Sequence, residues 1–145
     1  QPLRIAIRSR TSSFSRGVCS NGGALSSIGV SWSVYNSTFT HNRAVGNGAN
    51  PAAPGTPGGG SGGAIYNDGN RFRLLVAGST ITDNHANEGG GAIFYVSNNR
   101  TGTMSIANAT LSANPSAGFE TAGLPGMFVI AAPGQPVITG SSITP

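Results

Sequence analysis

The sequence predicts an all-β solenoid, in which short strands of successive repeats stack in parallel. Three observations predict it: a glycine-rich block that occurs three times, a Ser/Thr-rich block that follows each copy, and a large apolar residue at the centre of that second block. The glycine-rich blocks are residues 22–25, 62–65 and 89–93, and the Ser/Thr-rich blocks are residues 37–42, 79–84 and 109–114. Self-similarity at a period of roughly 25 to 40 residues is typical of repeat architectures.

Composition agrees with a single domain of this kind over residues 1–145. Only 8 % of the 145 residues are charged, against roughly a quarter in an ordinary globular domain, whereas Gly alone contributes 23. No segment approaches the roughly twenty apolar residues of a membrane span, so we expect none. The single Cys19 has no partner for an internal disulfide, and cysteine usage therefore leaves the compartment open.

The net charge is +4, and every basic side chain apart from the two histidines is an arginine. Arg4, Arg8, Arg10 and Arg16 fall within the first sixteen residues, and the others are scattered. The interleaving of aromatic and basic residues that characterises nucleic-acid-binding modules is missing. We therefore expect no nucleic-acid partner.

The Ser/Thr-rich blocks have the pattern of strands with one buried face, because a large apolar centre is flanked by small hydroxyl residues. Further apolar columns stand five and seven residues upstream of these centres, and another lies in the glycine-rich blocks. We therefore expect about three short strands in each repeat. The centres are Phe14, Phe39, Ile81, Leu111 and Ile143; the upstream columns are Val34, Val76, Ile106 and Ile138, with Ser9, and Ile7, Trp32, Leu74 and Met104; the glycine-block column is Leu25, Ile65, Ile93 and Phe128.

Glycine and asparagine are expected at the corners between strands, because both tolerate positive φ. Asn42, Asn84 and Asn114 end successive Thr-rich strands in one register. Stacked in parallel, their amides can bond to one another along the axis as well as to their own turns. A Gly/Pro/Ala-rich insertion at residues 44–62 interrupts the pattern and predicts a flexible corner loop.

Two of these blocks, Gly-Gly-Ala-Ile-Tyr-Asn at 62–67 and Ser-Thr-Ile-Thr-Asp-Asn at 79–84, resemble repeats of right-handed parallel β-helix proteins. The resemblance is nearest to the polymorphic outer-membrane-protein and autotransporter-type repeats of bacterial surface proteins, within the wider pectate-lyase-like group. It covers nearly the whole chain, most clearly residues 20–115. It implies a right-handed parallel β-helix of about four to five coils, at the cell surface or outside the cell.

Catalysis is not expected, although enzymes of this group cleave polysaccharides with clustered carboxylates. The chain has four acids, Asp68, Asp83, Glu88 and Glu120, and the stacking offers Asp83 no second carboxylate in the neighbouring repeats. Glycosidases need two carboxyl groups at a set separation, and calcium needs six to eight oxygen ligands. The most plausible catalytic cluster is Asp83, His85 and Arg73. We expect no catalytic residues, no cofactor and no metal site.

The outward hydroxyls of the Thr-rich strands form a predicted array of two columns. Its central members are Thr38, Thr40, Thr80, Thr82, Thr110 and Ser112, and we expect any binding to occur there. Such Thr-x-Thr ladders resemble the ice-binding faces of some antifreeze proteins, although Thr also simply favours strands.

The sequence thus favours a non-catalytic structural, adhesive or assembly component. The alternatives are a fragment of a polysaccharide-binding or polysaccharide-cleaving β-helix enzyme and an ice-binding protein. Neither end of the chain carries an evident polar cap, so we expect a partner subunit or a second copy at the open coil ends. The chain is equally consistent with being a piece of a longer β-helix.

Overall fold

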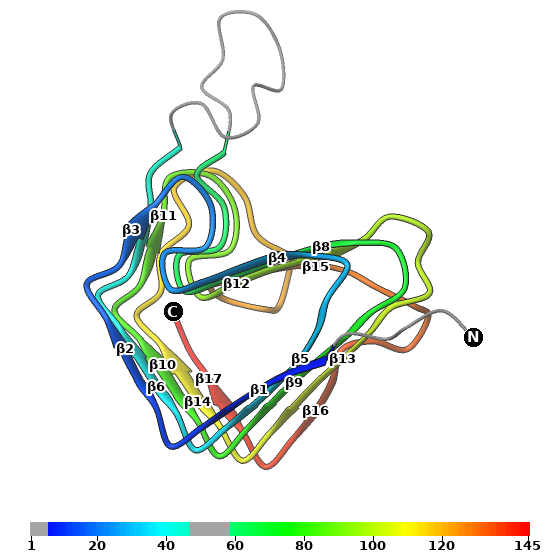
Figure 1. Ribbon diagram of the computed structural model, residues 1–145. Helices are drawn as coiled ribbons and strands as arrows, with labels where there is room; N and C mark the ends of the chain where they lie inside the picture. The colour runs from blue at the N-terminus through cyan, green and yellow to red at the C-terminus, as the bar shows by residue number, and fades with distance from the viewer. Residues whose placement is uncertain (1–5, 47–58) are drawn as a thin grey trace, which may run out of the picture.

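The computed structural model describes residues 6–46 and 59–145, and every helix or strand within them is a β-strand. All strand pairs are parallel, and they form four sheets, which we label A to D (Figure 1). The all-β, parallel architecture predicted from the sequence is confirmed. Sheet A contains β1 (Ala6–Arg10), β5 (Ser31–Tyr35), β9 (Arg73–Ala77), β13 (Thr103–Ala107) and β16 (Val137–Thr139); sheet B contains β2 (Ser13–Ser15), β6 (Thr38–Thr40), β10 (Thr80–Thr82), β14 (Thr110–Ser112) and β17 (Ser142–Ile143); sheet C contains β3 (Val18–Cys19), β7 (Arg43–Ala44) and β11 (His85–Ala86); sheet D contains β4 (Leu25–Ile28), β8 (Ile65–Gly69), β12 (Ile93–Ser97) and β15 (Met127–Ile130).

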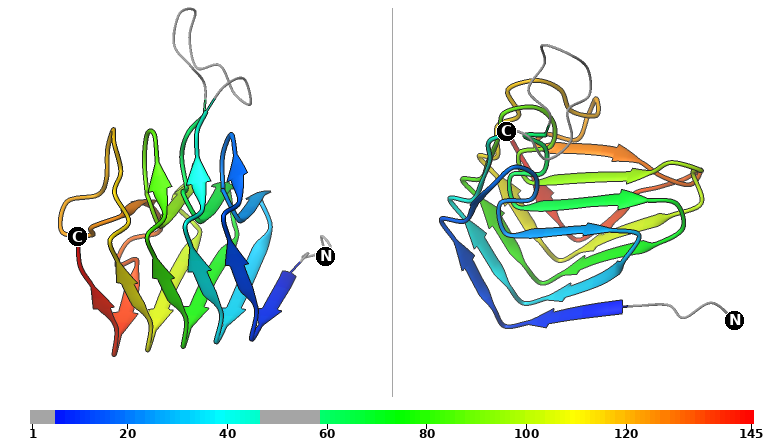
Figure 2. Two further views of the ribbon diagram at one scale, coloured as in Figure 1. Left: turned by 90° about the vertical axis from the view of Figure 1, so that its left-hand side faces the viewer. Right: turned by 45° about the horizontal axis from the view of Figure 1, so that its top comes forward.

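In chain order the strands pass from sheet A through B and C to D, and then return to A. Each passage is one repeat, and Figure 2 shows the strands of successive repeats lying side by side. After β14 the strand of sheet C is reduced to an isolated bridge between Ala86 and Ser116.

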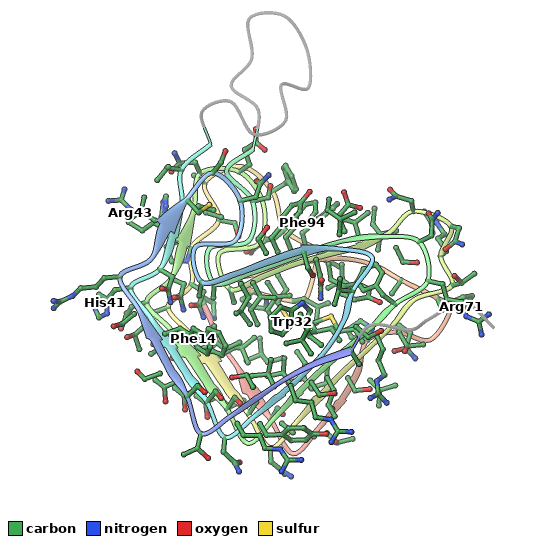
Figure 3. All side chains as sticks on the ribbon, viewed as in Figure 1. Phe14, Trp32, His41, Arg43, Arg71 and Phe94 are labelled. Atoms are coloured by element: carbon green, nitrogen blue, oxygen red, sulfur yellow. The ribbon has the colours of Figure 1, made fainter. Side chains whose placement is uncertain are left out.

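The predicted apolar columns form the core that the sheets enclose. Phe39, Ile81 and Leu111 are in register on sheet B and fully buried, and Phe14 and Ile143 continue the column on the outer strands. Figure 3 shows Phe14 and Trp32 pointing into the enclosed space. The upstream columns lie on sheet A, where Leu74 pairs with Trp32 and Met104, and Val76 pairs with Val34 and Ile106.

The expectation that Phe128 belongs to the glycine-block column is wrong. Ile93 pairs with Met127, which is fully buried, whereas Phe128 pairs with Phe94 on the outer side of sheet D. Met127 and Phe128 are adjacent and both apolar, so the sequence pattern permits either register. A slip of one residue reverses which side chains face inward.

The expectation of about three strands in each repeat also needs correction, because sheet C adds a fourth. Its strands are two residues long, and their inward side chains in β7 and β11 are Ala44 and Ala86, both fully buried. A two-residue strand with a small inward residue leaves no large apolar column in the sequence.

The glycine-rich blocks turn the chain into sheet D. In the block that precedes β8, Gly62 has a φ of 71°, a conformation that costs glycine little. A Cβ on the next residue, Gly63, would collide with the carbonyl oxygen of Gly91 in the following repeat. The first glycine therefore provides the turn, and the second allows neighbouring repeats to approach closely. Ala64, which follows, is fully buried.

Most of the insertion predicted at 44–62, namely residues 47–58, lies outside the described residues. Its two flanks lie together, because the backbone N–H groups of Gly46 and Gly60 both donate to the carbonyl oxygen of Ser20, at 3.1 and 2.7 Å. The two flanks are therefore held at one place in the repeat.

Candidate functional site

The outer face of sheet B carries the predicted hydroxyl array, and its two columns are in register. One column lies at the starts of the strands and the other at their ends. The first is Ser13, Thr38, Thr80, Thr110 and Ser142, and the second is Ser15, Thr40, Thr82 and Ser112. Adjacent members of a column are separated by about 4.8 Å, the spacing of neighbouring strands.

The two columns differ in exposure. Thr38, Thr80 and Thr110 are exposed, whereas Thr40, Thr82 and Ser112 are half-buried. Within the second column the hydroxyl oxygens of Thr82 and Ser112 lie 3.3 Å apart, at hydrogen-bonding distance. Each hydroxyl donates one hydrogen bond and accepts others, so the face presents a regular set of polar groups to a ligand.

A buried asparagine ladder fixes the ends of these strands. The Asn42 amide donates to Oδ1 of Asn84 at 2.9 Å, and the Asn84 amide donates to Oδ1 of Asn114 at 3.0 Å. The same oxygens accept the backbone N–H groups of Asn42 and Asn84, both at 3.0 Å. The prediction that these amides bond along the axis is confirmed.

Serines that precede the strands of sheet B fix two of the strand starts in a similar way. The backbone N–H of Ser37 donates to Oγ of Ser79 in the next repeat at 3.1 Å, and that of Ala109 donates to Oγ of Ser141 at 3.0 Å. Side chains of the next repeat therefore hold the backbone at both ends of β6, at the end of β10 and at the start of β14, which orders the strands that carry the hydroxyl columns.

The corner between sheets B and C carries a third column, whose members have positive φ. They are Arg16, His41, Asp83 and Ala113, with φ between 53° and 57°. The expectation that Asn42, Asn84 and Asn114 themselves take the positive-φ corner positions is therefore wrong: the preceding residue does, and the asparagines point inward. Arg16, His41 and Asp83 are exposed.

Beyond this corner, Arg43 of β7 pairs with Val18 and with His85 on the outer face of sheet C. Arg43 is exposed and His85 is half-buried. Figure 3 shows His41 and Arg43 projecting from the same edge of the molecule. This edge combines guanidinium and imidazole groups with the neighbouring hydroxyl columns.

The residues suggested as a catalytic cluster do not converge. Arg73 begins β9 in sheet A, whereas Asp83 follows β10 in sheet B and His85 lies in sheet C. Within residues 6–46 and 59–145, no group of three or more His, Cys, Asp or Glu side chains is placed to hold a metal ion.

Three of the four carboxylates have polar partners away from sheet B. Asp68 accepts hydrogen bonds from the Tyr66 hydroxyl at 3.3 Å and from the Asn98 amide at 2.9 Å. Glu120 accepts the backbone N–H of Gly126 at 2.9 Å, and Glu88 lies 3.5 Å from the Ser61 hydroxyl. Asp83 is the remaining acid, and it lies in the corner column.

An aromatic stack on the outer face of sheet D is not among the sequence-based expectations. The ring centroids of Tyr66 and Phe94 lie 4.9 Å apart and those of Phe94 and Phe128 5.3 Å apart, and both pairs are stacked. Phe119 packs edge-on against Phe128 at 4.8 Å. The sequence signal for the stack is an aromatic residue directly after the inward apolar residue that begins β8, β12 and β15.

The geometry of this stack disfavours a sugar-binding role. Its rings lie face to face along the axis, so both faces of Phe94 are covered by its neighbours and the ring edges point outward. The stack instead shields Tyr66, which is 7 % exposed. Burial, followed by the nearby charge of Asp68 and its hydrogen bond, raises the pKa of Tyr66 to about 12.

The described residues include no helix able to cross a membrane. Residues 78–96, which run from just before β10 into β12, match the repeat of the Chlamydia polymorphic membrane protein family. The match agrees with the resemblance to surface-protein repeats and supports, in coarse terms, a location at the cell surface. No curated protein and no solved structure matches the chain.

Proposed function

We propose that the chain is a non-catalytic cell-surface protein, folded as a right-handed parallel β-helix of four to five coils, with an adhesive role. Its contact face is the outer face of sheet B, and its ligand is a polysaccharide. Thr38, Thr40, Thr80, Thr82, Thr110 and Ser112 are the binding residues. The match of residues 78–96 to a surface-protein repeat supports the location.

The observation that carries the proposal is the register of the exposed threonines on a rigid sheet. Thr38, Thr80 and Thr110 are aligned across three neighbouring strands, whose ends are held by the asparagine ladder. Hydroxyl groups fixed in this way bind with little loss of side-chain freedom, because their positions are set before the ligand arrives. A polysaccharide supplies a matching series of donors and acceptors.

The test compares polysaccharide binding by two double variants. Thr80→Val with Thr110→Val removes two hydroxyls of the face while keeping the β-branched shape that strands favour. Thr103→Val with Thr139→Val makes the same change on sheet A. The proposal is supported when an array of neutral and acidic polysaccharides retains the wild type and the sheet A variant but does not retain the sheet B variant. Failure to retain any polysaccharide, or release of reducing ends or uronates from one, overturns it.

A second candidate for the same face is ice binding, which the regular spacing of its threonine column favours. Thermal hysteresis by the wild type, lost in Thr80→Tyr, would support this candidate over the polysaccharide. A wild type without hysteresis excludes it.

The partner we propose for the ends of the stack is a second copy of the chain. Five large apolar residues are more than a third exposed in the described part of the chain, and each lies in or beside an outermost strand of its sheet. They are Ile7, Val18 and Ile28 in the first repeat, and Phe119 and Val137 in the last two. A copy stacked end to end would pair the open strand edges and cover the side of each of these residues that faces the end of the stack.

Light scattering over a range of protein concentrations tests this partner. Stacked copies give a mass that rises with concentration, and Val18→Lys with Ile28→Lys lowers it, whereas Thr38→Lys with Thr80→Lys on sheet B does not. A monomer at every concentration overturns the stacking proposal, but it leaves the role of sheet B untouched.

A further inference from the structure

We propose that the polysaccharide bound by sheet B is acidic, and that Arg16 and Arg43 bind its carboxylate or sulfate groups. This inference rests on the proposed function of the sheet B face. It adds the class of ligand and two residues outside the hydroxyl columns.

Arg16 directly follows the second hydroxyl column, Arg43 lies just beyond the corner on sheet C, and backbone hydrogen bonds hold both positions. The N–H of Arg16 donates to the carbonyl oxygen of Thr40 at 3.1 Å, and the N–H of Arg43 donates to that of Gly17 at 2.8 Å. Arg16 occupies the corner position that His41 takes in the next repeat, and Arg43 follows His41 by two residues. Both arginines are exposed.

These cations have little competition from the protein's own carboxylates. Asp68, Glu88 and Glu120 are bonded to groups around sheet D, as described above. Asp83 alone shares the corner column, one repeat beyond His41. Among the other arginines, Arg10 lies over the Tyr35 ring on sheet A, with its guanidinium carbon 5.8 Å from the ring centroid.

The charges are close enough to act together on one ligand. Arg43 pairs with Val18, which follows Arg16 by two residues, so one strand spacing of about 4.8 Å and two residues separate the two arginines, a distance comparable to the Debye length of roughly 8 Å at physiological salt. A guanidinium group binds carboxylate or sulfate oxygens through paired, charge-assisted hydrogen bonds. The adjacent threonine hydroxyls are then free to bind the neutral hydroxyl groups of the same chain of sugars.

The surface favours an acidic polysaccharide over a nucleic acid. Proteins that bind single-stranded nucleic acids stack bases on aromatic side chains. The outward side chains of the sheet B strands are Ser and Thr throughout. The face therefore offers hydroxyl groups and arginines, but no stacking platform.

The experiment measures binding to heparin and polygalacturonate, with dextran as the neutral polysaccharide and a single-stranded oligonucleotide as the competing polyanion. Arg16→Gln with Arg43→Gln is compared with Arg73→Gln with Arg100→Gln. Each pair removes two exposed positive charges, so the two variants have the same net charge. We expect the first pair of substitutions to weaken heparin binding about tenfold or more and the second pair about twofold or less. Paired, charge-assisted hydrogen bonds contribute more binding free energy than the general attraction between a polyanion and exposed positive charges.

Asp83→Asn provides a test in the opposite direction. Asparagine adopts the positive φ of this corner readily, so the fold should be kept while the one acid of the column is removed. We expect heparin binding to tighten, and the difference from the wild type to shrink as salt rises.

This inference is overturned if the two double arginine variants weaken heparin binding equally, or if the wild type binds the oligonucleotide as tightly as heparin. Binding of dextran as tightly as heparin, with loss in the sheet B threonine variant, also overturns it while leaving the proposed function intact. Absence of binding to all the polysaccharides overturns both.

Discussion

Substituting Asn84 by alanine should destabilise the protein more than any substitution of an exposed asparagine. Asn84 is fully buried, and its amide donates to the carbonyl oxygens of Phe39 and Thr82 and to Oδ1 of Asn114, each at 3.0 Å. Its Oδ1 accepts two hydrogen bonds from Asn42. Alanine removes all of these bonds, in which the two amide hydrogens are shared among three acceptors.

The expected loss follows from what each partner retains. A protein hydrogen bond contributes about 1 kcal/mol net, and a buried donor left without an acceptor costs about 1–3 kcal/mol. The Asn42 amide keeps a bond to the carbonyl oxygen of Phe14, and Oδ1 of Asn114 keeps the Asn84 backbone N–H, but the backbone N–H of Asn42 loses its partner. We therefore expect a loss of about 3–5 kcal/mol, which lowers the melting temperature by roughly 10 °C in a chain of this size.

Thermal melting followed by circular dichroism, with urea unfolding for the free energy, measures this loss. Asn87→Ala is the matched control, because Asn87 is exposed and its amide makes a single bond, to the carbonyl oxygen of Val45 at 2.9 Å. The control should change stability by about 0.5 kcal/mol or less. Equal melting temperatures for the two variants would refute the view that the ladder stabilises the stack.

Three further predictions concern the core, the insertion and the tyrosines. Ile81→Asp should unfold the central repeats, because Ile81 is fully buried between Phe39 and Leu111; a circular dichroism spectrum and melting curve like those of the wild type would contradict the register. Deletion of residues 47–58 should leave the melting temperature nearly unchanged, because Gly46 and Gly60 already meet at Ser20; a large fall would show that the segment contributes to stability. Because the fold raises the pKa of Tyr66 from 10.0 to about 12, the stability contributed by its neutral form is intact below pH 10 and is lost as the pH rises towards 12. In an alkaline titration of tyrosinate absorbance, Tyr66→Phe should remove part of the late rise, and an unchanged late rise would count against the shift.

The sequence by itself determined the strands of sheets A, B and D and most of the core. Phe39, Ile81 and Leu111 recur at one position between small hydroxyl residues, and only a strand with a single buried face repeats in this way. The same alternation placed the threonines on the outside of sheet B. The bonding of the amides along the axis also followed from the register of Asn42, Asn84 and Asn114, because identical residues at identical positions meet when repeats stack, but their inward direction did not.

The tertiary structure alone decided which adjacent apolar residue faces inward and which charged groups become neighbours. Met127 and Phe128 are both apolar, so alternation gives no preference, and the choice depends on pairing with Ile93 across the sheet. The position of Arg16 follows from the repeat, because Arg16 directly follows a Ser/Thr-rich strand as His41 and Asp83 do, whereas that of Arg43 depends on a two-residue strand too short to leave a period in the sequence. Contacts between repeats set such a position. A side chain near a corner is placed by the backbone of the neighbouring repeat as well as by the backbone of its own repeat.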